Sequence, residues 1–327
     1  MNGVRSWPGE RDVELKELVT RLRVPVICAP MFLVSDPSLT IAACRAGIVG
    51  SFNSHNARTS SELELWLNQI EAALEAARAQ APQVSVAPYA LNLPARRQGN
   101  SRYDADLEIC VRFRVPLVVT MAGDPSEIVN AVHGYGGSVL HDVVSLDHAR
   151  KAASAGVDGL IVLCAGAGGH TGNLNPFAFL PQVRKIFSGL LVLAGGISDG
   201  NGIRAAQVLG ADLAYMGTRF IATRESNVPT RYKEMLLSQQ TRDLVLTDAI
   251  SGLSASFMRA SIEAVGLDPD KLPPPKGLFQ PELPDAIKAW RDVWSAGHGV
   301  GLIEDLPSME DLVARLSAEY AAAAASR

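Results

Sequence analysis

The sequence predicts an α/β protein with the architecture of a TIM (β/α)8 barrel, extended by a smaller, mostly helical inserted region. Three observations predict this fold. The chain has 327 residues, 47% of them hydrophobic, which is enough apolar material for one large core. Eight short apolar runs alternate with amphipathic segments from residue 24 onward. Several of the amphipathic segments end at glycine, as helices often do.

The eight apolar runs are rich in Val, Ile and Leu, as parallel strands buried on both faces are. Segments that can form crossover helices lie between them, and the clearest is residues 60–80, with apolar residues at helical spacing. Eight strands separated by crossover helices favour a closed barrel, with a doubly wound open sheet as the alternative. The predicted strands span residues 24–30, 48–54, 84–92, 116–123, 138–144, 159–166, 190–197 and 211–220.

Two segments interrupt the alternation. Residues 93–105 are polar, and residues 225–296 combine polar and helix-like stretches with a proline-rich loop, so both are interpreted as insertions over one mouth of the barrel. Trp290 and Trp294 lie one helical turn apart, a spacing typical of a helix packed onto its core, with a lid contact over substrate as the alternative. The predicted order is a first barrel part at 1–92, an insertion at 93–105, a second barrel part at 106–224, a helical lid or substrate region at 225–296, and a barrel return with a C-terminal helix at 297–327.

Composition excludes several classes of function. Thirty Lys and Arg residues against 34 Asp and Glu residues give a net charge of −4, which argues against duplex nucleic acid and anionic membranes as partners. The four cysteines, without metal-ligand spacing, predict reduced, buried thiols and no metal site. No apolar stretch reaches the roughly 18 residues that a membrane span needs. We therefore expect a cytoplasmic protein that acts on a small molecule, in an oligomeric state that the sequence leaves open.

Glycine-rich sequences follow the last two predicted strands. The seventh strand ends in Gly195-Gly196, and the eighth ends in Gly217-Thr218. Exposed backbone N–H groups at such turns bind phosphate, and these two loops are the usual phosphate site of barrel enzymes. The alternative is that the glycines only permit tight turns between strand and helix.

One histidine stands in the glycine-rich loop after the sixth strand, Cys164 to Asn173. An imidazole titrates near working pH, so His170 suits a general base or a hydrogen-bond donor to a ligand. A structural histidine bonded to a carbonyl group is the alternative, because a histidine among glycines is a weak motif by itself.

Three separated motifs carry a family resemblance: AGGHTGN at 167–173, AGGISDGNG at 194–202 and MGTRF at 216–220. In this order and spacing they resemble the FMN-dependent nitronate monooxygenases, formerly called 2-nitropropane dioxygenases, of a TIM-barrel superfamily. WSAGHGVGLI at 294–303 is similar to the WSAGQGVGLI segment of that family. The likeness runs from Pro30-Met31 to about Ile303. FMN-dependent enoyl-thioester reductases and some quinone reductases share the same glycine motifs.

The resemblance implies FMN as the cofactor, with its phosphate in the second barrel part. His170 matches the catalytic histidine of the family. The phosphate would rest on backbone amides of Gly195, Gly196, Gly217 and Thr218, and the isoalloxazine ring would lie across the barrel mouth near Ala29, Pro30, Met31, Asn92, Gly168 and Gly169.

The resemblance also implies a reaction, the oxidation of an alkyl nitronate or a nitroalkane by O2 to a carbonyl compound and nitrite. His170 would abstract the acidic α proton of a nitroalkane, or donate a hydrogen bond to the oxygens of a nitronate. Two other functions stay open. One is an NAD(P)H-dependent FMN reductase acting on a quinone or an enoyl thioester, and the other is a flavin-binding barrel without turnover.

Several positions depart from the family pattern, among them Gly166, where many relatives have a glutamate, and Leu163, where many have a polar residue. Asp142 follows His141 at the end of the fifth strand, where some relatives have a lysine near the flavin, and it is interpreted as the cap of the next helix. His298 replaces the usual glutamine of the WSAG segment. It is either a second titratable group near the site or a solvated loop residue.

Overall fold

Parallel strands at the centre of the molecule close into a barrel. The computed structural model describes residues 15–325. Eight strands form one parallel sheet in the order β1-β9-β8-β6-β5-β4-β3-β2. A parallel bridge between Ile27 and Val49 joins its two edges, so the sheet closes. The predicted barrel is therefore confirmed, and the open-sheet alternative is wrong. The strands are β1 (Val26–Cys28), β2 (Gly50–Asn53), β3 (Tyr89–Pro94), β4 (Leu117–Met121), β5 (Ser138–Val143), β6 (Gly159–Leu163), β8 (Leu190–Ala194) and β9 (Leu213–Met216).

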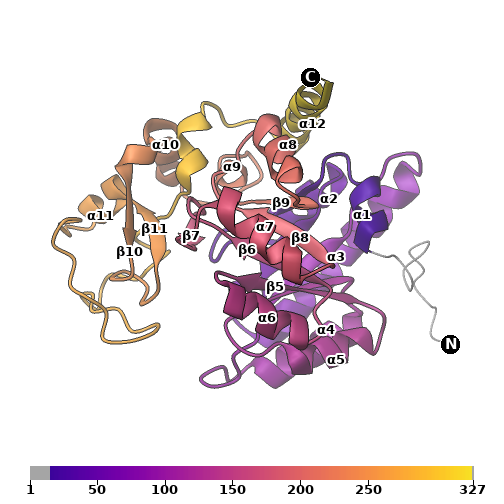
Figure 1. Cartoon of the computed structure of the whole chain (residues 1–327), viewed down its shortest axis with the longest axis horizontal. Coiled ribbons are helices and arrows are strands. Elements are labelled where there is room, and N and C mark those ends of the chain that lie inside the picture. Colours follow the sequence, from indigo (N-terminus) through magenta and orange to yellow (C-terminus); the bar gives the residue numbers. More distant parts are fainter. Residues whose placement is uncertain (1–14, 326–327) are drawn as a thin grey trace.

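Helices cover the outside of the barrel (Figure 1). The predicted helix at 60–80 is confirmed as α3, which begins where the Thr59 side chain accepts a hydrogen bond from the Glu62 amide at 3.1 Å. Its Leu63, Leu67 and Ile70 are buried in the outer core. The helices packed around the barrel are α2 (Pro37–Arg45), α3 (Ser60–Gln80), α4 (Tyr103–Phe113), α5 (Ser126–His133), α6 (Leu146–Ser154), α7 (Pro176–Ile186), α8 (Gly200–Val208) and α12 (Met309–Ala325). Helix α1 (Leu15–Arg21) instead packs its Leu18 against the cluster inside the barrel. No helix within residues 15–325 is long and apolar enough to cross a membrane.

Side chains alternate between two cores along each strand, because successive residues of a strand point to opposite faces. In β5, Val139 and Val143 pack outward against the helices, whereas Leu140 belongs to the cluster inside the barrel. The interior cluster also includes Ile27, Val49, Ala90, Val119, Ile161, Val192 and Leu213. The next inward position beyond this layer therefore faces the mouth at the carboxyl ends of the strands.

Each predicted strand differs from the observed one at one end or both, and two of them differ most. The strand expected at 84–92 is β3 at 89–94. The strand expected at 211–220 ends at Met216, because residues 218–221 form the single turn of α9 (Thr218–Ile221). The MGTRF motif is thus a strand-to-helix turn, and its Arg219 is buried against the carbonyl and carboxylate oxygens of Asp305.

The inserted region at 225–296 forms a lobe beside the barrel, drawn in orange in Figure 1. Its helices α10 (Thr230–Ser238) and α11 (Arg259–Ala264) have only 9 and 6 residues. Strands β10 (Leu244–Thr247) and β11 (Ala255–Met258) pair in an antiparallel sheet with β7 (Gly169–His170) of the barrel loop. The prediction of a mostly helical region is therefore wrong.

The physical reason lies in the sequence of the lobe. Prolines recur between residues 269 and 284, and proline cannot continue a helix, so the chain runs there as an extended loop. The expected helix around Trp290 and Trp294 is absent too. Trp290 has a φ of 68°, in the left-handed region, which breaks any helix at that point.

Candidate active site

A cavity of about 680 Å³ opens at the carboxyl ends of the barrel strands, within the usual size range of ligand sites. The structure brings together all of the residues that the sequence singled out as site residues. Its lining includes Ala29, Pro30, Met31, Asn92, Gly168, Gly169, His170, Gly195, Gly196, Gly217 and Thr218. Their individual roles toward a ligand stay predictions.

Hydrogen bonds tie the glycine loops into one cradle. The Gly166 carbonyl accepts from the amides of Gly196, at 3.1 Å, and of His298, at 2.9 Å. The Thr218 hydroxyl accepts from the Gly297 amide at 2.9 Å. The loops after β6, β8 and β9 and the 294–303 segment therefore hold one another in place. The Gly196 amide already has a protein acceptor, so a phosphate would compete with the Gly166 carbonyl for it.

Two glycines of the cradle leave no room for a side chain. A Cβ on Gly297 would lie 2.6 Å from the Gly166 carbonyl oxygen and 2.8 Å from the Gly168 nitrogen. Gly195 has a φ of 142°, and a Cβ there would lie 2.8 Å from the Ala165 carbonyl oxygen. The backbone segments approach so closely that only glycine fits.

His170 lies in an aromatic enclosure. Strand β7 pairs with β11, so the sheet of the lobe fixes the His170 backbone opposite Ala255. Its ring stands edge-on to Trp290, with centroids 5.3 Å apart, and to Phe279, at 6.1 Å. Burial lowers the pKa of His170 to about 4. The imidazole is therefore neutral at physiological pH, and its buried Nε2 lacks a hydrogen-bond partner among the described residues.

A polar wall faces the cavity from strands β2 and β3. Asn92 is buried, and its side-chain oxygen accepts from the Asn53 amide nitrogen at 2.7 Å. This bond leaves the donor end of Asn92 for a ligand. The adjoining η1 turn (Ser54–Asn56) carries His55, which also lines the cavity.

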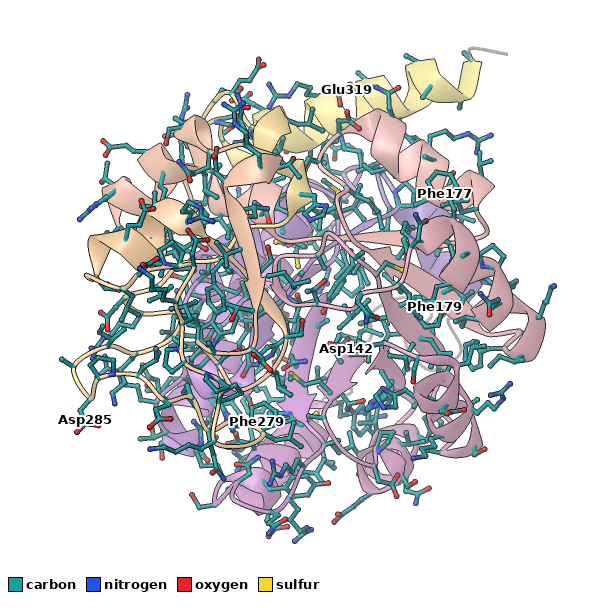
Figure 2. The ribbon with its side chains drawn as sticks, turned by 60° about the vertical axis from the view of Figure 1, so that its left-hand side comes forward. Asp142, Phe177, Phe179, Phe279, Asp285 and Glu319 are labelled. Carbon is teal, nitrogen blue, oxygen red and sulfur yellow. The ribbon has the colours of Figure 1, made fainter. Side chains whose placement is uncertain are left out.

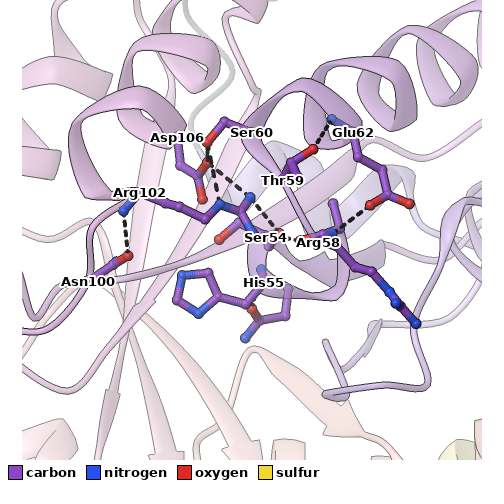
Figure 3. Close-up of polar contacts among 11 residues, drawn as sticks. Ser54, His55, Arg58, Thr59, Ser60, Glu62, Asn100, Arg102 and Asp106 are labelled. Carbon is purple, nitrogen blue, oxygen red and sulfur yellow. Dashed lines mark hydrogen bonds and ion pairs between the residues drawn. The ribbon is translucent and has the colours of Figure 1, made fainter.

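The His55 imidazole lies beside an ion-pair network (Figure 3). Arg102 pairs with Asp106 at 3.1 Å and donates to the Ala57 carbonyl at 2.6 Å, which locks the η1 turn to α4. Burial and the nearby Arg102 charge lower the pKa of His55. Its Nε2, like that of His170, is buried without a partner in the part of the chain that the structure describes. The site therefore contains a second neutral imidazole.

Asp142 corrects a prediction. Ser145, and not Asp142, caps α6, by accepting from the His148 amide at 3.1 Å. Asp142 instead lines the cavity from β5, near the centre of the barrel in Figure 2. Burial raises the pKa of its carboxyl group to about 7. The cap prediction failed because the strand continues to Val143, which places Asp142 inside the sheet rather than at a helix entry.

The remaining predictions concern the rim. His298 is exposed and packs against Gly166, and it is absent from the cavity lining. This agrees with a solvated loop residue.

Trp290, assigned to helix packing, lines the cavity instead, together with Phe279. Arg96 of the 93–105 insertion lies 5.7 Å from the centroid of the Phe279 ring, and this contact links the two inserted segments across the mouth.

Sequence reasoning missed several lining residues, among them His55, Arg96, Tyr215 and Phe279. A positional signal existed for two of them. His55 follows β2 directly, and Tyr215 lies two residues after Leu213, so both fall at carboxyl ends of barrel strands. Arg96 and Phe279 had no such signal, because they reach the cavity from insertions.

Comparisons with known proteins agree with this architecture. A sequence model of the family described as nitronate monooxygenase matches residues 14–319. A nitronate monooxygenase of Paraburkholderia phytofirmans is 31% identical over 340 residues, covering 90% of this chain and 92% of that protein. A protein of Rhodococcus jostii named (3aS,4S,5R,7aS)-5-hydroxy-7a-methyl-1-oxo-octahydro-1H-indene-4-carboxyl-CoA dehydrogenase is 26% identical, covering 91% and 93%.

Two solved structures share the fold. Nitroalkane oxidase from Streptomyces ansochromogenes superposes with a TM-score of 0.77 at 23% identity, covering 95% of this chain and 99% of that one. FabK from Thermotoga maritima gives a TM-score of 0.74 at 24% identity, covering 95% and 96%. At these identities the likeness concerns the barrel and its lobe, and not the reaction.

Proposed function

Because the chain belongs to the nitronate monooxygenase family, an oxidoreductase family, we propose that it uses FMN and O2 to convert an alkyl nitronate to a carbonyl compound and nitrite. The observation that carries this proposal is the position of His170. Its neutral imidazole opens onto the one cavity that also contains the residues matching the family's flavin contacts.

The residues of the cavity fit FMN. The crowded glycines at 195 and 297 form a cradle of backbone groups at the strand ends, the setting in which barrels hold phosphate. The free donor end of Asn92 and the small residues Ala29 and Gly168 leave space for a flat ring. Gly195, Gly217 and Thr218 would hold the phosphate, and the ring would lie toward Asn92 and His170. Bound FMN would supply the electron acceptor and the site of reoxidation by O2.

His170 suits an anionic substrate better than a neutral one. With a pKa of about 4, its imidazole is a weak base toward the α proton of a nitroalkane. A nitronate needs no such base. Its negative charge would favour a proton on His170, since an adjacent opposite charge raises the pKa of an imidazole. His170 would therefore donate a hydrogen bond to a nitronate oxygen and orient the substrate.

The aromatic enclosure would exclude water from the reacting atoms. Trp290 and Phe279 stand against the His170 ring, and both come from the loop that follows α11. Their apolar surfaces would strengthen the hydrogen bond between imidazole and nitronate, because electrostatic interactions gain strength in a dry site. The fixed β7–β11 pairing would keep the imidazole in register with the cavity.

Anaerobic mixing tests this function. Purified protein is loaded with FMN and mixed without oxygen with propyl-2-nitronate, and separately with NADPH and NADH. We expect the nitronate to bleach the flavin absorbance, and admission of air to restore it with release of nitrite. Rapid bleaching by NADPH or NADH with no response to nitronate would overturn the proposal and favour a reductase. A flavin that no donor reduces would indicate a binding protein without turnover.

A reductase is the second candidate, and one comparison favours it. The Rhodococcus jostii relative is named as a dehydrogenase of a CoA thioester and matches nine-tenths of this chain. The NADPH and NADH arms of the experiment above decide between the two functions.

A further inference from the structure

The cavity contains few charged side chains. Among its described lining residues, Asp142 is the only carboxylate, and Arg96 is the only lysine or arginine. Arg96 belongs to the exposed rim, over the Phe279 ring, whereas Asp142 projects from strand β5. The inner part of the cavity thus has an acid and no cation.

Strand alternation places the Asp142 side chain inside the barrel. Leu140, two residues earlier, belongs to the interior cluster, so the Asp142 side chain points the same way and forms part of the cavity floor. The neighbouring His141 points outward, where its Nδ1 lies 2.7 Å from the Thr120 hydroxyl. Asp142 Oδ1 is buried and has no hydrogen-bond partner within residues 15–325. A buried carboxylate oxygen without a partner is costly, and a ligand or a proton would relieve that cost.

The groups facing Asp142 from other elements are neutral at physiological pH. The phenol of Tyr215 in β9 is close enough for the Asp142 charge to raise its pKa further, and the Cys28 thiol, in the cluster outside the barrel, acts on the same phenol. Burial raises the pKa of both groups. Adjacent β6 presents Leu163, and β4 presents Met121, which are uncharged. His170 and His55 line the same cavity and have lowered pKa values. Burial alone therefore raises the pKa of Asp142 to about 7.

A flavin ring above this floor changes the charge that Asp142 meets. Oxidised FMN has a neutral ring, whereas two-electron reduction in a dry site leaves the ring with a negative charge. That charge would lie beside the only acid of the cavity, with no inner cation to offset it. Two like charges in one buried site cannot both persist, so the carboxylate would be protonated.

We propose that Asp142 takes up a proton when FMN in this cavity is reduced and releases it on reoxidation. This inference depends on the proposed flavin site. Oxidised FMN takes two electrons and one proton to give the anionic reduced ring, and the Asp142 carboxylate takes one further proton to give the carboxylic acid. The electrons come from the nitronate in turnover, or from an electrode or dithionite in the test. The protonated carboxyl would replace a cation as the group that stabilises the reduced ring.

The pH dependence of the FMN midpoint potential in the holoenzyme tests the proposal. Each proton taken up per electron pair contributes about 30 mV per pH unit. Above pH 7 the wild type should show a slope about twice that of Asp142→Asn, which has no carboxyl to protonate. Asp147→Asn is the matched control, because Asp147 is 82% exposed on the helix that follows β5 and pairs with Arg150. It should keep the wild-type slope.

Equal slopes for the wild type and Asp142→Asn would overturn the proposal. A second measurement covers the case in which Asp142→Asn binds FMN poorly. The reduced-minus-oxidised infrared spectrum of the wild type, labelled with 13C in aspartate carboxyl groups, should gain an isotope-sensitive band of a protonated carboxyl. Its absence would overturn the proposal while the function stands. A protein that takes up no FMN would overturn both.

Discussion

The imidazole of His170 stands perpendicular to the indole of Trp290, with 5.3 Å between the ring centroids and 89° between the ring planes. The two residues come from different parts of the chain, one from the loop after β6 and the other from the inserted lobe. Trp290 has left-handed backbone, with a φ of 68°, and so does Phe279, at 59°. Residues held in such strained conformations concentrate at functional sites. The lobe thus holds two residues in unfavourable backbone conformations, and their aromatic rings pack against the His170 imidazole.

The first prediction concerns this aromatic wall. Trp290→Ala should raise the pKa of His170 from about 4 toward the ordinary value near 6.5, because water would then solvate the charged imidazole. A pH titration of the His170 ring resonances by NMR measures the shift. Trp294→Ala is the control, since Trp294 stacks on Tyr232 at 4.9 Å instead of contacting His170. A pKa in Trp290→Ala that stays near 4 would refute this account.

The second prediction separates the two roles open to His170. His170→Asn keeps a hydrogen-bond donor but removes the base. Because we propose a donor role and Asn keeps a donor, we expect turnover of a neutral nitroalkane and of the matching nitronate to fall by small and similar factors, whereas a base role would lower the nitroalkane rate alone by roughly 100-fold or more. Initial rates of nitrite release with both substrates measure this difference. The control His148→Asn, on the exposed surface of α6, should leave both rates unchanged. A loss confined to the nitroalkane would contradict the donor role.

The third prediction tests the glycine cradle. Gly297→Ala would force a Cβ to 2.6 Å from the Gly166 carbonyl oxygen, so the 294–303 segment must move away from the loop after β6. We expect the affinity for FMN to fall by at least about tenfold, which corresponds to about 1.4 kcal/mol. Gly301→Ala is the matched control in the same segment, where the nearest atom would lie 3.8 Å away. Fluorescence titration with FMN compares the two variants, and equal affinities would count against the cradle.

The fourth prediction uses Asp142 without any cofactor. Its pKa of about 7 in the folded state lies above the ordinary value of 3.8, so the folded chain binds more protons than the unfolded chain between pH 4 and 7. Stability due to this group is therefore present at low pH and is lost as pH rises through that window. At pH 8, Asp142→Asn should be more stable than the wild type by about 1–3 kcal/mol. At pH 4 this advantage should vanish.

Thermal melts of the FMN-free protein at both pH values measure this difference. Asp147→Asn, on the exposed face of α6, should show no such pH-dependent gain. If Asp142→Asn is destabilised at pH 8 by as much as at pH 4, the carboxyl group is not held in an unfavourable environment. The measurement does not require FMN, so it tests the environment of Asp142 separately from the proposed function.

Patterns in the sequence predicted the strands of the barrel and the glycine-rich loops of the cradle. Strands buried on both faces read as continuous apolar runs, and α3 reads as a helix because its apolar residues recur at helical spacing. Gly195 and Gly297 are required by close backbone approach, so the motifs around them report geometry directly. The strand and helix patterns depend on neighbours near in the chain, which is why a linear pattern predicts them, whereas Gly195 and Gly297 approach Ala165 and Gly166 from distant parts of the sequence.

Only the tertiary structure decided which side chains meet across the cavity. Trp290 and Trp294 have helical spacing, yet the chain turns at 290–292, where Trp290 has left-handed backbone and its amide donates to the Val293 carbonyl, and Trp290 packs against His170. Aspartate is a residue type typical of helix caps, yet the pleat of β5 points the Asp142 side chain into the barrel. Burial, and with it the pKa of His170 and Asp142, depends on segments that are distant in sequence. A local sequence pattern does not show which distant segments will cover a residue. The pKa values of His170 and Asp142 are therefore determined only when the lobe and the barrel pack together.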